Sequence, residues 1–435
     1  MGSIYTHAYL TIAASSAPDC DTGFLVEKDW VRPVTLVHDG IESTAHVQRN
    51  FAHPSHPGGV LDTRGWFFQE WLLSRRILWF DDDEMTWTCV RRACCECGAV
   101  DLTDKPIHLG EPFDRFFMRK TFRGMLQRSS YNNEYEAWYA LVNAYVEKDL
   151  TYSTDRLPAF TAIAERLKEL TGDVYLAGIW KKDILRGLGW SYRDINTIIN
   201  KRHLTPRELS VPTWSWACSG TRSWVYNAVQ GSSGFGRDIE TMVYKREFLG
   251  TEVTCVDYHL LSNNEFGPAI GKIELRGLIA MALLTCSSDL SDRSRDCLTL
   301  VSHGSAIPQK SSRWNPLGYS FIRDCHLQPK QWDFSGLLDV GETNTVQRCD
   351  RDTAQDAVDA LVVLVPLYVD VFKTPSTIAP VPAFTRVREV LVIAPSSNAS
   401  EDNGVYQRIG LLHVNMDEEW ETLLRVANMS TVTIE

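Results

Sequence analysis

The spacing of hydrophobic residues changes twice along this chain, and the changes predict three structural regions. Residues 1–100 contain a short alternating stretch, a strongly apolar segment and two short apolar runs. Apolar positions then recur at helical spacing from about 112 to 200, and after Pro212 they alternate as in strands. We therefore expect an α+β fold with boundaries at 1–100, 101–210 and 211–435, a helical middle layer and a β-rich C-terminal region.

The first region is expected to form a helix followed by a hairpin. Thr63–Ser74 carries apolar residues around most of a helical circumference, which is typical of a buried helix, and Asp62 is its expected N-cap. Ile77–Phe80 and Met85–Cys89 are separated by an acidic turn and are expected to pair as strands. The alternation within residues 1–16 predicts one more strand, with a helical first turn as the alternative.

The spacing of apolar residues is more regular in the second and third regions than in the first. Tyr135–Tyr145 and Leu157–Leu170 each place their apolar residues on one helical face, and Gly172 is expected to end the second helix. Further strands are expected at Lys272–Leu278, Ala360–Tyr368, Glu389–Ala394 and Val405–Val414. The segments without an apolar period, expected to be loops, are 18–59, 219–239 and 286–356.

Composition and charge narrow the classes of function. The chain has 435 residues, of which 44% are hydrophobic and 11% aromatic, as expected of a folded protein with several packed cores. Its 44 basic and 55 acidic residues give a net charge of -11, which disfavours binding to nucleic acid. One dense basic segment alternates with apolar residues and is expected to be the edge of an amphipathic helix: Arg115, Arg119, Lys120, Arg123 and Arg128.

The sequence predicts neither a membrane span nor secretion. The longest apolar run, Ala360–Val369, contains Pro366 and is too short for a spanning helix, so it predicts a buried strand. Eleven scattered cysteines and the absence of a signal peptide favour a cytoplasmic location. Met1–Thr6 fits the pattern for myristoylation of Gly2, but no basic cluster follows as a second anchor, and we interpret the match as accidental.

One block of the sequence resembles a known family. Thr63–Leu78 contains Arg64-Gly65-Trp66, then Gln69-Glu70 and then Leu73-Ser74-Arg75-Arg76, and this order resembles a block of fungal heterokaryon-incompatibility (HET) domains. Met1–Ala14 is similar to the block that precedes it in those domains. Four later segments are similar to those that HET proteins carry downstream: Asp155–Phe160, Tyr175–Trp180, Pro212–Ala217 and Tyr406–Gly410.

The resemblance implies both a fold and a function. HET domains have been proposed to be distant relatives of TIR domains, so it implies a TIR-like unit. It also implies intracellular non-self recognition that promotes programmed cell death, through a protein partner and with self-association as an option. A full HET domain begins with a tryptophan-glycine block that this chain lacks. We therefore expect 1–100 to be the C-terminal part of the domain, either because the start is assigned too late or because the chain is a remnant.

Glu70 is the sharpest candidate for chemistry. It is expected on the helical face of Trp66 and Leu73, where a carboxylate needs a partner or a proton. One hypothesis is a general acid or base with a raised pKa, acting with Arg64 and Gln69. The other, which we prefer, is a structural ion pair between Glu70 and an arginine that fixes the helix to the hairpin.

The cysteines and tryptophans form weaker candidate sites. Zinc ligands usually come as two well-spaced pairs, whereas four cysteines here are irregularly spaced and two are adjacent: Cys89, Cys94, Cys95 and Cys97. No metal or other cofactor is therefore expected. Trp214 and Trp216, alternating on a predicted strand, could stack a ligand but are expected in the core. Gly65 and Trp66 are likewise expected to have structural roles.

Three functions are open at this point. The first, which we prefer, is transmission of a non-self signal through protein partners. The second is hydrolysis of NAD or another nucleotide centred on Glu70, because some TIR domains cleave NAD with a glutamate; the absent first strands of the sheet count against it. The third is an inert or accessory truncated protein linked to a metabolite gene cluster.

Overall fold

The protein has an α+β fold, as expected, in a computed structural model. The structure describes residues 2–25, 32–47, 59–81, 84–89, 91–98, 101–103, 119, 122–123, 126, 134–192, 210–218, 223–225, 245–286, 297–301, 319–323, 358–374, 383–396, 405–414 and 417–435. Its helices are α1 (Gly2–His7), α2 (Val60–Thr63), α3 (Gly65–Leu73), α5 (Glu134–Val146), α6 (Thr161–Thr171), α7 (Ile184–Gly187) and α9 (Asp417–Val426). Short 3-10 turns are η1 (Ser153–Asp155), η2 (Pro158–Phe160), η3 (Lys181–Asp183) and η4 (Trp216–Cys218).

The strands form one small sheet, one large sheet and three two-stranded pairs. The small sheet has the order β1 (Thr11–Ala13), β4 (Arg76–Phe80), β5 (Met85–Cys89), β6 (Arg92–Cys95) and β7 (Asp101–Thr103). The pairs are β2 (Arg32–His38) with β3 (Ile41–Val47), β8 (Tyr175–Leu176) with β9 (Ile179–Trp180), and β10 (Trp190–Tyr192) with β11 (Ser223–Val225). The large sheet contains β12 (Lys245–Phe248), β13 (Glu252–Leu260), β14 (Ala269–Cys286), β15 (Cys297–Val301), β16 (Tyr319–Arg323), β17 (Val358–Thr374), β18 (Ala383–Pro395), β19 (Val405–Val414) and β20 (Asn428–Ile434).

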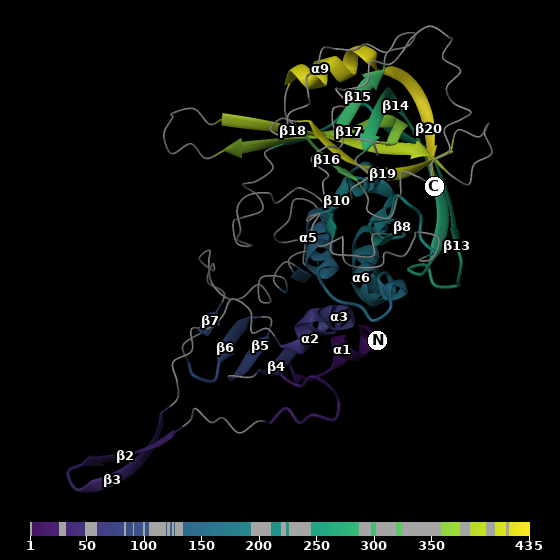
Figure 1. The fold of residues 1–435 in the computed structure, drawn as a ribbon. Coiled ribbons are helices and arrows are strands. Elements are labelled where there is room, and N and C mark those ends of the chain that lie inside the picture. Colours follow the sequence, from purple (N-terminus) through teal and green to yellow (C-terminus); the bar gives the residue numbers. More distant parts are fainter. Residues whose placement is uncertain are drawn as a thin grey trace.

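Figure 1 shows these parts in succession: the small sheet at one end, α5 and α6 in the middle, and the large sheet with α9 at the other end. The parts share one hydrophobic core, which runs from Ala13 through Trp138 and Trp216 to Ile434. Within the described residues, no helix is long and apolar enough to cross a membrane. The boundaries at 1–100, 101–210 and 211–435 stay predictions.

The helix and hairpin of the first region are present and packed together. Strand β1 runs parallel to β4, and α3 lies between them in the chain, so these elements form a β-α-β unit. Strands β4 and β5 pair as the predicted hairpin. Phe67 of α3 meets Trp79 of β4 edge to face, with ring centroids 5.7 Å apart. The expected helix therefore covers the expected hairpin.

Two expectations for the first region are wrong. The helix does not run unbroken from Asp62, because Arg64 is extended and separates α2 from α3 as the N-cap of α3. The segment 18–59 is not wholly a loop, because β2 and β3 pair within it. Asp39 and Gly40 both have positive φ, 51° and 75°, as the turn of a tight hairpin requires. The Asp-Gly pair was the missed signal.

The middle of the chain is helical as expected, and one residue of the basic segment, Arg119, lies in the interior. Helix α6 ends at Gly172, whose φ of 62° gives the left-handed cap that glycine favours. Arg119 is buried and donates hydrogen bonds to Oγ1 of Thr88, at 3.1 Å, and to the carbonyl of Ser74. Burial and the neighbouring Arg123 lower the pKa of the Arg119 guanidinium to about 9. Arg115, Lys120 and Arg128 lie outside the described residues.

The four strands expected in the C-terminal region are present as β14, β17, β18 and β19. Strands β14, β17, β18, β19 and β20 pair in a closed ring, in which β20 joins β19 back to β14. Alternate residues of β17 face two cores, one shared with the helices and one covered by α9, which explains its continuous apolar run. Two expected loops contain strands: β15 and β16 lie within 286–356, and β11 lies within 219–239. Apart from Cys286 at the end of β14, the other residues of both segments lie outside the described residues.

Trp214 and Trp216 are in the core, as expected, but not on a strand. Both are fully buried, and residues 213–215 form a turn that leads into η4. The Ser215 hydroxyl accepts a hydrogen bond from the Ala217 amide, and the Cys218 amide donates to the Ser215 carbonyl. A serine side chain that captures a nearby amide competes with strand pairing. The turn, not a strand face, directs both indoles inward.

Candidate functional site

The HET-like block begins at a tight backbone contact. The Gly65 amide donates to the Asp149 carbonyl at 2.7 Å, and the Asp149 amide donates to the Thr63 carbonyl at 2.5 Å. These bonds hold Arg64 extended between α2 and α3. A Cβ atom at position 65 would lie 2.5 Å from Cδ2 of Leu150 and 3.3 Å from the Asp149 carbonyl oxygen, so the Leu150 side chain would have to shift. Glycine suits this position because it allows the two segments to pack closely.

The next residues of the block join α3 to the segment 155–162. Nε1 of Trp66 donates to Oδ2 of Asp155 at 3.0 Å. Oε1 of the buried Gln69 accepts from the amide of Ala162 at 3.3 Å. Asp155–Phe160 is itself a segment of the HET resemblance. Trp66 and Gln69 thus connect two resemblance blocks, and their role here is structural.

The Trp66–Asp155 hydrogen bond predicts a measurable coupling between distant positions. In a double-mutant cycle of Trp66→Phe and Asp155→Ala, we expect about 1 kcal/mol of coupling in the free energy of unfolding, since both groups are partly exposed. Urea unfolding of the four proteins measures it. Trp87→Phe with Asp155→Ala is the control pair, and equal coupling in both cycles contradicts the prediction.

Glu70 is half-buried and links α3 to α1. The Tyr5 hydroxyl donates a hydrogen bond to the Glu70 carboxylate, and Arg64 adds a favourable charge interaction. Burial raises the pKa of the Glu70 carboxyl group although both partners lower it, and burial together with Glu70 raises the pKa of Tyr5 to about 12. The arginine that interacts with Glu70 is Arg64, which precedes α3, and the hydrogen bond of Glu70 joins α3 to α1, whereas a link between the helix and the hairpin was expected. The raised pKa itself agrees with the acid–base hypothesis.

The comparisons with known proteins are negative. No model of a protein family, no curated protein and no solved structure matches the chain.

The other resemblance segments meet in the shared core. Tyr175–Trp180 forms the β8–β9 hairpin, and its Gly178 carbonyl accepts hydrogen bonds from Nε1 of Trp216, at 2.7 Å, and of Trp138, at 3.3 Å. Ser215 donates to the Ala177 carbonyl at 2.5 Å. Indole nitrogens thus satisfy the buried carbonyl groups of the hairpin. Trp216 holds this hairpin and is not placed to stack a ligand.

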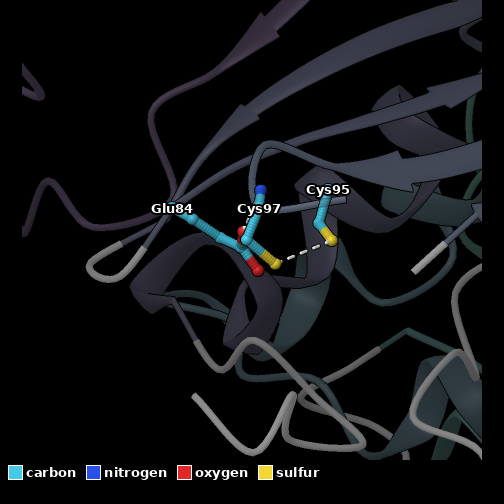
Figure 2. Close-up of side chains that lie close together, drawn as sticks. All are labelled: Glu84, Cys95 and Cys97. Carbon is cyan, nitrogen blue, oxygen red and sulfur yellow. Dashed lines mark hydrogen bonds between the residues drawn. The ribbon is translucent and has the colours of Figure 1, made fainter. Parts of the chain in front are cut away.

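The structure separates the four candidate cysteines. Cys95 and Cys97 lie together at the end of β6 with Glu84, which sequence reasoning missed, and the three ligand atoms are within 4.8 Å of one another (Figure 2). Cys89 is at the opposite end of β5, and Cys94 points to the other face of β6 because neighbouring strand residues alternate. The irregular cysteine spacing therefore still includes two cysteines, Cys95 and Cys97, that form a compact group with Glu84.

A buried polar network around Asp183 also escaped sequence reasoning. Oδ2 of Asp183 accepts from the Tyr139 hydroxyl at 2.9 Å. Arg186, buried behind it, pairs with Glu136 and lies over the Tyr139 ring at 4.4 Å. Nη1 of Arg246 on β12 lies 3.7 Å from Oε1 of Glu136. The network joins the helical layer to the large sheet, and no local sequence pattern connects these positions.

The network predicts a pH dependence of stability. Burial, with a smaller effect of Glu136, raises the pKa of Asp183 to about 6, although Tyr139 and the nearby arginines lower it. The folded state binds the proton more tightly, so this contribution is full below the unfolded pKa and is lost as the pH rises through about 6. Relative to wild type, the free energy of unfolding of Asp183→Asn is expected to rise by about 2 kcal/mol between pH 4 and pH 7, because most of the effect of the raised pKa falls within this range. Urea unfolding across this range measures it; a constant difference contradicts it.

Proposed function

We propose that this chain acts in fungal non-self recognition, in which a HET-type unit passes a signal to a protein partner and promotes programmed cell death. The observation that carries the proposal is the position of α3. The helix that bears the resemblance block connects two parallel strands and packs on the hairpin that follows it. The block is therefore part of a β-α-β unit, in which a helix lies between two parallel strands.

The block residues support signalling more than catalysis. Gly65, Trp66 and Gln69 are used in backbone contacts and hydrogen bonds that hold α3 in place. Glu70 is the exception, and its carboxylate is bound to Tyr5. A catalytic glutamate has to meet substrate, whereas this one ties two helices of the unit together.

Exposed apolar side chains on α1, on β1 and between them support a protein partner. Ile4, Tyr9 and Ile12 are 67%, 81% and 57% exposed. Strand β1 is also at the end of the small sheet's strand order, so one of its edges is not paired within that sheet. Grouped apolar residues beside an open strand edge are typical of surfaces that bind another chain, which includes a second copy.

Regulated expression in a fungal host tests the proposal. Wild-type chain is expected to cause cell death without loss of NAD. Tyr9→Ser with Ile12→Thr is expected to abolish death at unchanged protein level, because it removes apolar surface without touching the core. Glu70→Gln, which retains a hydrogen-bond acceptor for Tyr5, is expected to leave death unchanged.

The matched control is Tyr152→Ser, which removes an aromatic ring that is 68% exposed elsewhere. Its expected result is death at the wild-type level. Absence of death with wild-type chain contradicts the proposal and supports the inert or accessory alternative. Death accompanied by NAD loss, with both abolished in Glu70→Gln, supports the hydrolase instead.

A further inference from the structure

The pairing of β5 with β6 brings Glu84, Cys95 and Cys97 together. Thr86 pairs with Cys95 in the antiparallel register, and the Glu96 amide donates to the Met85 carbonyl at 2.9 Å. One step further, the Cys97 amide donates to Oε2 of Glu84 at 3.0 Å. Glu84, just before β5, and Cys97, just after β6, are therefore neighbours in space, although no short sequence motif contains both.

The three side chains converge closely. Figure 2 shows the Cys95 sulfur facing that of Cys97, with the Glu84 carboxylate beside them. The sulfur atoms are 3.3 Å apart, and all three ligand atoms lie within 4.8 Å of one another. In a tetrahedral zinc site, Zn–S bonds of about 2.3 Å set the sulfurs roughly 3.8 Å apart, so only a small separation is needed.

Burial and charge favour a cation at this point. Glu84 and Cys95 are only 7% and 8% exposed, while Cys97 is exposed. Zinc binds cysteine as thiolate and accepts carboxylate oxygen as a further ligand, so these three side chains are a donor set that suits a zinc ion.

We propose that Glu84, Cys95 and Cys97 bind one zinc ion, with a fourth position on the exposed side of Cys97. The backbone of the turn is suited to this role. The Gly98 amide donates to the Cys95 carbonyl at 3.2 Å, and Gly98 has a φ of 74° that glycine adopts without strain. The ion would clamp the ends of β5 and β6, beside the hairpin that packs on α3. The inference does not depend on the proposed function.

Metal titration of the full chain tests the site. The chain is stripped with chelator, kept reduced with a thiol-free reductant and titrated with Co²⁺. We expect a cobalt–thiolate charge-transfer band that saturates at one ion per chain and disappears when Zn²⁺ is added. Zn²⁺ is also expected to raise the melting temperature. Glu84→Gln is expected to keep the band but weaken affinity at least about 10-fold.

A double variant provides the decisive comparison, because the neighbouring cysteines offer a match. Cys95→Ser with Cys97→Ser is expected to lose the band and the zinc-dependent rise in melting temperature. Cys89→Ser with Cys94→Ser removes the same number of thiols and is expected to retain both. Circular dichroism checks that each variant is folded. If a double variant does not fold, the affinity of Glu84→Gln tests the site in its place. No ion bound by the wild-type chain, or equal loss in both double variants, overturns the assignment.

Discussion

Trp216→Ala is expected to lower the free energy of unfolding by about 4 kcal/mol. The indole is fully buried and meets the rings of Tyr145 and Phe160 edge to face, each with centroids 6.3 Å apart. Its removal leaves a cavity and takes a donor from the Gly178 carbonyl, which retains the longer bond from Trp138. Urea unfolding followed by circular dichroism measures the loss.

Tyr152→Ala is the control for this prediction. The ring is 68% exposed, so its removal is expected to change stability by less than about 0.5 kcal/mol. A loss below about 2 kcal/mol for Trp216→Ala would mean that the core closes around the missing ring. That result would contradict the role of Trp216 in holding the β8–β9 hairpin.

Gly178→Ala is expected to cost about 3 kcal/mol for two separate reasons. The residue has a φ of 100°, where a side chain adds roughly 1–2 kcal/mol of strain. A Cβ atom there would also lie 2.5 Å from Nε1 of Trp216, a rigid buried ring. Thermal and urea unfolding of the purified variant measure the cost.

Gly172→Ala separates these two reasons. Gly172 also has a positive φ, 62°, but a Cβ atom there would meet nothing within 4 Å. The expected cost is about 1 kcal/mol, from backbone strain alone. Equal losses at the two positions would show that contact with Trp216 adds nothing.

The parts of the fold that sequence reasoning predicted are those with a strong local period. The helix at Glu134–Val146, the β4–β5 hairpin and the strands β14, β17, β18 and β19 each bury a face that the apolar spacing marks. Two of the misses have non-local causes, whereas the missed β2–β3 hairpin carries a local signal, the Asp39-Gly40 pair. Arg64 is extended because Asp149, far along the chain, pairs with it, and Ser215 bonds across to Ala177.

For the candidate sites, too, local sequence features were predicted and contacts between distant segments were not. Sequence reasoning singled out Glu70 and the structural pair Gly65 and Trp66, because a contiguous block carried them. It could not supply Tyr5 as the partner of Glu70, since that contact depends on the packing of α1 against α3. It also could not join Glu84 to Cys95 and Cys97, because only strand register makes them neighbours.

The weakest junction in the closed ring of the large sheet determines where the sheet is expected to unfold first. The junction of β19 with β20 consists of two residue pairs, Val405 with Thr433 and Tyr406 with Ile434, whereas β17 and β18 pair along most of their length. Local unfolding is therefore expected to begin at this short junction. Once it separates, apolar strands gain unpaired edges that can template pairing with another molecule. Destabilised variants of this chain should consequently be lost to aggregation before they unfold completely.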